Sequence, residues 1–112
     1  MAIHHLFQKI DRALRNRPDA LRWRVTMDET QIEVFRRPIL TSAVTLGALG
    51  LTDAPIPIPR CIVQLQMADN GSVAVDALWN DTHYSDPIHL AVERVVWLCN
   101  AYTNTEIDTP AT

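Results

Sequence analysis

Glycine is scarce in this sequence, with three residues in 112. A phosphate-binding loop, a dinucleotide-binding motif and a Gly-x-Ser-x-Gly nucleophile motif each need closely spaced glycines, and none of the three motifs occurs. His-Glu-x-x-His, the zinc-protease signature, is absent as well. The motifs therefore give no reason to expect an enzyme, and we predict no catalytic residue.

Cysteine is almost as rare. Cys61 and Cys99 stand far apart in apolar surroundings, which excludes a zinc ribbon or a Cys-x-x-Cys redox motif on spacing. Both are expected to be buried thiols, and the alternation of its strand is expected to point Cys61 into the hydrophobic core. Residues 1–10 carry two histidines and Lys9 where an export signal would have its apolar core. We therefore expect reduced thiols in a cytoplasm, that of a bacterium or of a phage-infected host.

Long hydrophobic runs are missing too. Every apolar stretch is far shorter than the roughly 20 residues of a membrane-spanning helix, so no membrane association is predicted. A chain of 112 residues with 47% hydrophobic content can build one core. We expect a single domain over residues 1–112, with a flexible polar tail at about 104–112.

The two ends of the chain have the periodicity of helices. Apolar residues at three- and four-residue steps predict a helix from the N-terminus to about Arg17, where Pro18 stops it. A very apolar second helix is expected from Pro87 to about Tyr102, capped by Asp86. Such a helix must pack on a sheet and has apolar surface to spare for a partner.

Alternating apolar and polar residues between the helices predict strands. These strands cover residues 21–27, 31–36, 39–46, 61–67 and 73–77, with Asn70-Gly71 as a hairpin turn. Residues 47–59, with three alternating prolines, read as a stiff loop, and residues 80–85 as a second loop. The predicted fold is α+β: a two-layer sandwich with an antiparallel sheet of about five strands and both terminal helices on one face.

The loop before the last helix offers groups that bind metals or act in catalysis. Oxygen and nitrogen ligands stand close together at Asp81, His83, Asp86 and His89. Their spacing matches no recognised metal motif, and capping and turn formation explain the aspartates, so no metal or cofactor is predicted. Cys61 or Ser85 beside His83 would make a nucleophile–base pair, but neither has an activated setting in the predicted fold.

Charge is divided unevenly along the chain. Residues 1–39 hold eight of the ten basic and five of the thirteen acidic side chains, and the remaining residues hold two basic and eight acidic ones. A nucleic-acid-binding surface would use the basic residues of the first hairpin region: Arg22, Arg24, Arg36 and Arg37. The overall pI of about 5.7 argues against a dedicated nucleic-acid binder.

The favoured functional surface is the aromatic, acidic loop and the start of the last helix. Trp and Tyr beside Asn and Asp have the composition of a protein-binding hot spot. The predicted partner-binding residues are Trp79, Asn80, Asp81, His83, Tyr84, Asp86 and Glu93. The alternative for Trp79 and Tyr84 is that they cover the end of the core.

The size and the element order resemble small phage-encoded α/β sandwich proteins, among them anti-CRISPR-type inhibitors. The resemblance implies a protein that occupies another macromolecule's surface stoichiometrically, often with an acidic patch that mimics nucleic acid. Such a patch would be supplied by Asp53, Asp69, Asp76, Asp81, Asp86 and Glu93.

Two other families share parts of this layout. The helix–strands–helix order is similar to that of double-stranded RNA-binding domains, but residues 86–94 lack the lysine cluster of that family. Small acidic α+β proteins with terminal helices also include the class I type III secretion chaperones, which would imply a homodimer. That family has a middle helix that the pattern here does not show.

The sequence thus predicts a small non-enzymatic protein-binding module, whose partner is another protein or a nucleoprotein complex. Two alternatives stay open: a nucleic-acid-binding accessory protein that uses the basic N-terminal half, and a chaperone-like homodimer. The partner and the oligomeric state are not determined by the residues.

Overall fold

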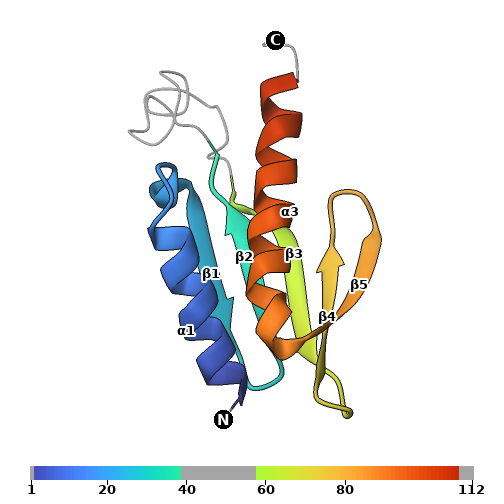
Figure 1. The fold of residues 1–112 in the computed structure, drawn as a ribbon. Coiled ribbons are helices and arrows are strands. Elements are labelled where there is room, and N and C mark those ends of the chain that lie inside the picture. Colours follow the sequence, from blue (N-terminus) through green and yellow to red (C-terminus); the bar gives the residue numbers. More distant parts are fainter. Residues whose placement is uncertain (1, 39–57, 109–112) are drawn as a thin grey trace.

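The described part of the protein is a five-stranded antiparallel sheet with two α-helices on one of its faces (Figure 1). The structure, a computed structural model, describes residues 2–38 and 58–108. The helices are α1 (Ala2–Arg15) and α3 (Ile88–Asp108). The strands are β1 (Trp23–Met27), β2 (Gln31–Arg36), β3 (Arg60–Met67), β4 (Ser72–Ala77) and β5 (Thr82–Pro87). The predicted α+β sandwich is confirmed.

The strands follow one another in the sheet in the order of the chain, so that each pairs with its sequence neighbour. The expected strand at 39–46 and most of the expected stiff loop at 47–59 lie outside the described residues. The described part of the sheet reaches five strands because residues 82–87 pair with β4. Within the described residues, β1 and β5 are the two edges of the sheet.

Alternate residues of the strands point toward the helices and form the core. Ile32, Val34, Leu65, Val73 and Val75 are fully buried on this face. The α1 stripe that packs against them repeats at three- and four-residue steps and consists of Ile3, Leu6, Ile10 and Leu14. From α3, Ala91, Val95, Leu98 and Cys99 complete the cluster. Within residues 2–38 and 58–108, the opposite face of the sheet carries no helix, and we call it the open face (Figure 1).

The second hairpin forms as its turn residues predict. Gly71 has a φ of +85°, a conformation that glycine adopts without strain, and Asn70 Oδ1 accepts a hydrogen bond of 3.0 Å from the Ser72 amide. The first helix ends at Arg15, within two residues of the predicted end. None of the helices in the described part of the chain is long and apolar enough to cross a bilayer.

Cys61 was expected in the core, and this expectation is wrong. The register between β2 and β3 shifts at Val34/Phe35, so that Val34 pairs with Val63 and Phe35 pairs with Cys61. The bulge leaves Ile62 and Val63 both fully buried and puts the half-buried Cys61 on the open face, next to Glu33.

Residues 82–87 form a strand, although a loop was predicted there. Their backbone pairs with β4 through partners such as Val75 and Tyr84. The strand places Thr82, Tyr84 and Asp86 on the helix-covered face and His83 and Ser85 on the open face. Asp86 is therefore a strand residue, and its carboxylate bonds to Arg94 instead of capping the helix. Pro87 ends β5, and α3 begins at Ile88.

The last helix is longer than its hydrophobic pattern predicts. It continues past Tyr102 to Asp108, through part of the expected flexible tail. Glu106, one turn beyond the expected end, accepts hydrogen bonds from Arg36 (2.8 Å) and Arg22 (3.3 Å). These ion pairs hold the last turns of α3 against the ends of β1 and β2.

Candidate functional site

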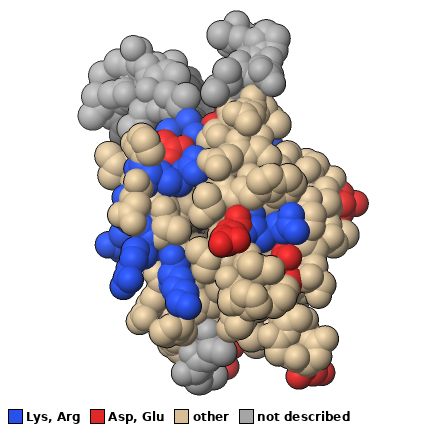
Figure 2. Space-filling view, in the orientation of Figure 1, with Lys and Arg blue, Asp and Glu red and all other residues tan. Residues whose placement is uncertain are grey.

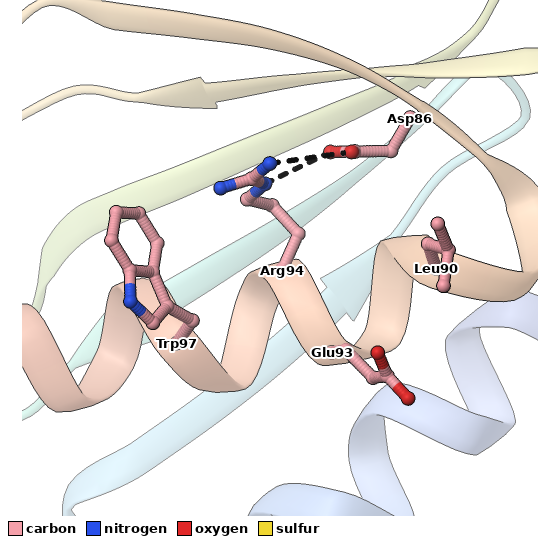
Figure 3. Close-up of a pocket in the computed structure, with 5 residues that line it drawn as sticks. All are labelled: Asp86, Leu90, Glu93, Arg94 and Trp97. Carbon is pink, nitrogen blue, oxygen red and sulfur yellow. Dashed lines mark hydrogen bonds and ion pairs between the residues drawn. The ribbon is translucent and has the colours of Figure 1, made fainter.

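The outward side of α3 and the edge strand β5 together form the candidate site, which we call the α3–β5 face. It consists of Tyr84, Asp86, Leu90, Glu93, Arg94 and Trp97. Glu93 and Arg94 come three and four residues after Leu90, and Trp97 comes seven residues after it, so the four α3 members share one side of the helix. With Asp86 they line a shallow hollow of about 360 Å³ (Figure 3).

Arg94 is the centre of this face. Its Nε donates a hydrogen bond of 3.1 Å to Asp86 Oδ2, and its Nη2 lies 3.5 Å from Asp86 Oδ1. Figure 3 shows the side chain of Arg94 reaching from α3 toward Asp86. The guanidinium carbon lies 4.2 Å from the ring centroid of Tyr84 and 5.2 Å from that of Trp97, both within the range of cation–π attraction.

The two aromatic rings also contact each other. Tyr84 and Trp97 have centroids 6.1 Å apart and an interplanar angle of 88°, an edge-to-face arrangement. Trp97 is nevertheless 53% exposed, and Leu90, two turns earlier on the same side of α3, is 40% exposed. The face therefore holds an indole against Tyr84 and Arg94 while about half of the Trp97 surface stays in contact with water.

The predicted partner-binding residues are divided between four places. Tyr84, Asp86 and Glu93 belong to the α3–β5 face. Trp79 packs on the core and meets Tyr102 edge-on at 5.5 Å, so it covers the end of the core. Asn80 and Asp81 form the turn between β4 and β5, where Asp81 has a φ of +55°.

His83 lies on the open face, where Asp81 is the member of the predicted set that it contacts. Its Nδ1 is 2.7 Å from Asp76 Oδ1 and its Nε2 is 3.4 Å from Asp81 Oδ1. The hydrogen bond to Asp76 raises the pKa of His83 above its ordinary value, and the negative charge of Asp81 adds to the effect. The carboxylate of Asp86 accepts a hydrogen bond from Arg94. Within residues 2–38 and 58–108, no three His, Cys, Asp or Glu side chains are placed to hold a metal ion.

The sequence reading missed Leu90, Arg94 and Trp97 as members of the site. The buried stripe of α3 is Ala91, Val95, Leu98 and Cys99. Leu90, Arg94 and Trp97 repeat at four- and three-residue steps and form a second stripe. That second periodicity was the available signal.

Of the predicted basic residues, the structure brings Arg22, Arg36 and Arg37 together at one end of the sheet and places Arg24 on the open face. Arg36 is only 6% exposed, with its guanidinium over the Trp23 ring at 4.4 Å and bonded to Asp19 and Glu106. Arg24 lies opposite Phe35 on the open face. Arg22 and Arg37 lie near the end of β2. Arg22 Nη2 donates a hydrogen bond to the carbonyl oxygen of Arg37, and Arg37 Nη1 donates one to the carbonyl oxygen of Leu21. Figure 2 shows that Lys and Arg gather over α1 and at the adjacent end of the sheet, whereas the surface over α3 is largely uncharged.

The carboxylate of Asp19 accepts hydrogen bonds from Arg17, from Arg36 and from the indole of Trp23 in the core. Burial alone would raise its pKa, but hydrogen bonds from Arg17, Trp23 and Arg36 outweigh that effect and lower the pKa to about 2. Asp19 therefore stays ionised at every ordinary pH and offsets part of the positive charge of the arginines.

Both thiols are poor nucleophiles in this fold. Burial, with the nearby charge of Glu33, raises the pKa of Cys61 to about 11. Burial raises the pKa of Cys99 to about 12. Both cysteines are free, and at neutral pH both are protonated thiols.

Comparison of the chain with protein-family models, with curated proteins and with solved structures gives no match.

Proposed function

We propose that this protein is a non-enzymatic protein-binding module and that its partner docks on the α3–β5 face. The observation that carries the proposal is the exposure of Trp97 and Leu90, 53% and 40%, on one side of a helix beside an edge strand. Tryptophan and arginine are the residues most enriched in binding hot spots, and here they are neighbours.

The geometry of the face suits binding because little order has to be gained. Trp97 is held by Tyr84 and Arg94, and Arg94 is held by Asp86. An anchor whose rotamer is already fixed loses less side-chain entropy when a partner covers it. Burial of the exposed part of the indole then contributes favourably at about 25 cal/mol per Å² of apolar area.

The edge of β5 adds a second means of recognition. Its outer backbone groups have no strand neighbour within the described sheet, so an extended partner segment can pair with them and extend the sheet. Asp81, which is 95% exposed, puts a negative charge in the turn before this strand, and Glu93 adds another on the exposed side of α3. Charge complementarity favours a partner segment that carries lysine or arginine among apolar residues. A second copy would bring two acidic edges together, which disfavours self-pairing.

A binding role also agrees with the state of the cysteine and histidine side chains, which are not set up as a nucleophile and its base. The Cys61 and Cys99 thiols have pKa values of about 11 and 12, and His83 is committed to Asp76 on the exposed side of the sheet. In this proposal the module acts stoichiometrically by covering part of its partner, as an inhibitor of a macromolecular machine does.

The test is affinity capture from the cells that express the protein, with three versions of the full chain as bait. The wild type is compared with Leu90→Ser/Trp97→Ser and with Leu21→Ser, which alters an apolar residue that is 85% exposed at the other end of the molecule. We expect the wild type and Leu21→Ser to retain one dominant protein and the double variant to lose it. Equal capture by all three baits would refute docking on this face.

The charge of the face is tested with the captured partner in hand. Asp81→Lys and Glu93→Lys change exposed side chains and leave the Asp86–Arg94 bond intact. We expect the association rate to fall in both variants and the difference to shrink as salt is raised. Analytical ultracentrifugation of the wild type shows in the same series whether the chain forms the alternative homodimer.

A further inference from the structure

Four arginines surround a hollow of about 320 Å³ at the end of the sheet where β2 ends and β3 begins. They are Arg22, Arg36, Arg37 and Arg60, and the remaining lining residues are Pro38, Ile58, Tyr102 and Glu106. None of these residues lines the hollow of the α3–β5 face. We call this feature the arginine hollow.

The positive charge of the arginine hollow is only partly neutralised. Glu106 is the one carboxylate among its described lining residues, and it bonds to Arg36 and Arg22. No ion pair joins Arg37 or Arg60 to a carboxylate within the described residues, and both side chains are exposed. The segment 39–57, which connects the two rims, has Asp53 as its single charged residue in the sequence.

The strand register makes this arrangement costly for the fold. Arg36 and Arg60 are direct partners across the β2–β3 pair. Like charges directly opposite each other on antiparallel strands destabilise a sheet. Arg37 adds a further positive charge next to them, in a protein whose net charge is −3. An anion bound between Arg37 and Arg60 would remove this repulsion.

We propose that the arginine hollow binds a compact anion that carries one or two phosphate groups. Guanidinium groups present planar pairs of N–H donors that match the oxygens of phosphate. The volume of about 320 Å³ is at the lower end of small-molecule sites and leaves room for one or two such groups.

An extended nucleic acid fits this part of the molecule less well. Unpaired bases need exposed aromatic platforms, but Trp23 is 5% exposed under Arg36, and Tyr102 is partly buried against Trp79. Arg24, the other arginine of this region, lies on the open face. The arginine hollow therefore offers phosphate-binding groups, whereas Trp23 and Tyr102 beside it do not offer exposed rings for base stacking.

The test is titration of the full chain with inorganic phosphate and with pyrophosphate at low ionic strength, followed by calorimetry and by thermal unfolding. The site variant is Arg37→Gln/Arg60→Gln. The control, Lys9→Gln/Arg12→Gln, also removes two positive charges, but from the exposed side of α1. We expect pyrophosphate to bind and to raise the Tm, with an affinity loss of about tenfold or more in the site variant and about twofold or less in the control.

A single variant separates a binding role from a structural one. Arg60→Gln relieves the repulsion with Arg36, so the ligand-free variant is expected to unfold at a higher temperature than the wild type while it binds pyrophosphate more weakly. Absence of a Tm shift with either anion at millimolar concentration, or equal weakening by the site and control pairs, would overturn the proposal. So would tighter binding of a twelve-nucleotide oligothymidylate that depends on Lys9 and Arg12, since that result indicates a nucleic-acid surface.

Discussion

Arg36 Nη2 donates a hydrogen bond of 2.8 Å to Glu106 Oε1, which joins residues 70 positions apart in the chain. Arg36 is buried at the end of β2, and Glu106 stands in the last turns of α3. The same arginine bonds to Asp19 and lies over Trp23. One side chain thus connects the last helix, the sheet and the segment that follows α1.

Removal of the Glu106 charge should destabilise the protein measurably. Glu106→Gln leaves the buried Arg36 with only Asp19 as a carboxylate partner, and we expect a loss of about 2 kcal/mol in the free energy of unfolding. Urea denaturation followed by circular dichroism measures this difference. Glu93→Gln is the matched control on the same helix, and its effect should stay within about 0.5 kcal/mol because Glu93 is exposed. Equal losses in both variants would contradict the role of the Arg36–Glu106 pair.

Acid should weaken the same network through Asp19. The folded-state pKa of Asp19 is about 2, below its ordinary value of 3.8, so its contribution is fully present above pH 3.8 and is lost as the pH falls toward 2. We expect Asp19→Asn to be less stable than the wild type at pH 6, and the difference to shrink between pH 4 and about pH 2. Urea midpoints of the two proteins at matched pH values measure the convergence. A difference that stays constant over this range would show that the carboxylate charge is not what stabilises the network.

The layered fold could be predicted because strong local patterns specify it. Ile3, Leu6, Ile10 and Leu14 repeat with a helical period, and Asn70-Gly71 is a turn sequence that both flanking strands accommodate. β5 was missed because its sequence is polar and ends in proline. Its strand conformation comes from pairing with β4, a tertiary contact that local propensity does not encode.

The site was only partly predictable for a similar reason. α3 is apolar on more than one side, and periodicity alone does not decide which stripe meets the sheet; Leu98 is 1% exposed and its neighbour Trp97 is 53% exposed. The burial of Arg36, by contrast, had a signal, because it follows Ile32 and Val34 in strict alternation. A charged residue on the core side of such a pattern needs a partner, and the partner was in the segment expected to be a tail.

The two tryptophans Trp23 and Trp97 should respond very differently to truncation. Trp23 is 5% exposed, so Trp23→Ala removes core packing and its hydrogen bond to Asp19, and we expect a loss of about 3–5 kcal/mol. Trp97→Ala removes a ring that is mostly in water and should cost less than about 1 kcal/mol. Urea denaturation of both variants measures these losses. A large loss at Trp97 would mean that the α3–β5 face is part of the structural core and not a docking surface.

The thiols should react slowly, and Glu33 should control one of them. Burial and the charge of Glu33 raise the pKa of Cys61 to about 11, so little thiolate is present at pH 8. Glu33→Gln removes the negative charge 3.7 Å from Sγ, and we expect Cys61 to react with a disulfide reagent several-fold faster at pH 8. Cys99, buried in the helix–sheet core with a pKa of about 12, should react only as the protein unfolds. The measurement is the rate of thiol labelling in Cys61→Ser and Cys99→Ser backgrounds. A rate for Cys61 that Glu33→Gln leaves unchanged would mean that burial alone, and not the carboxylate beside it, keeps the thiol protonated.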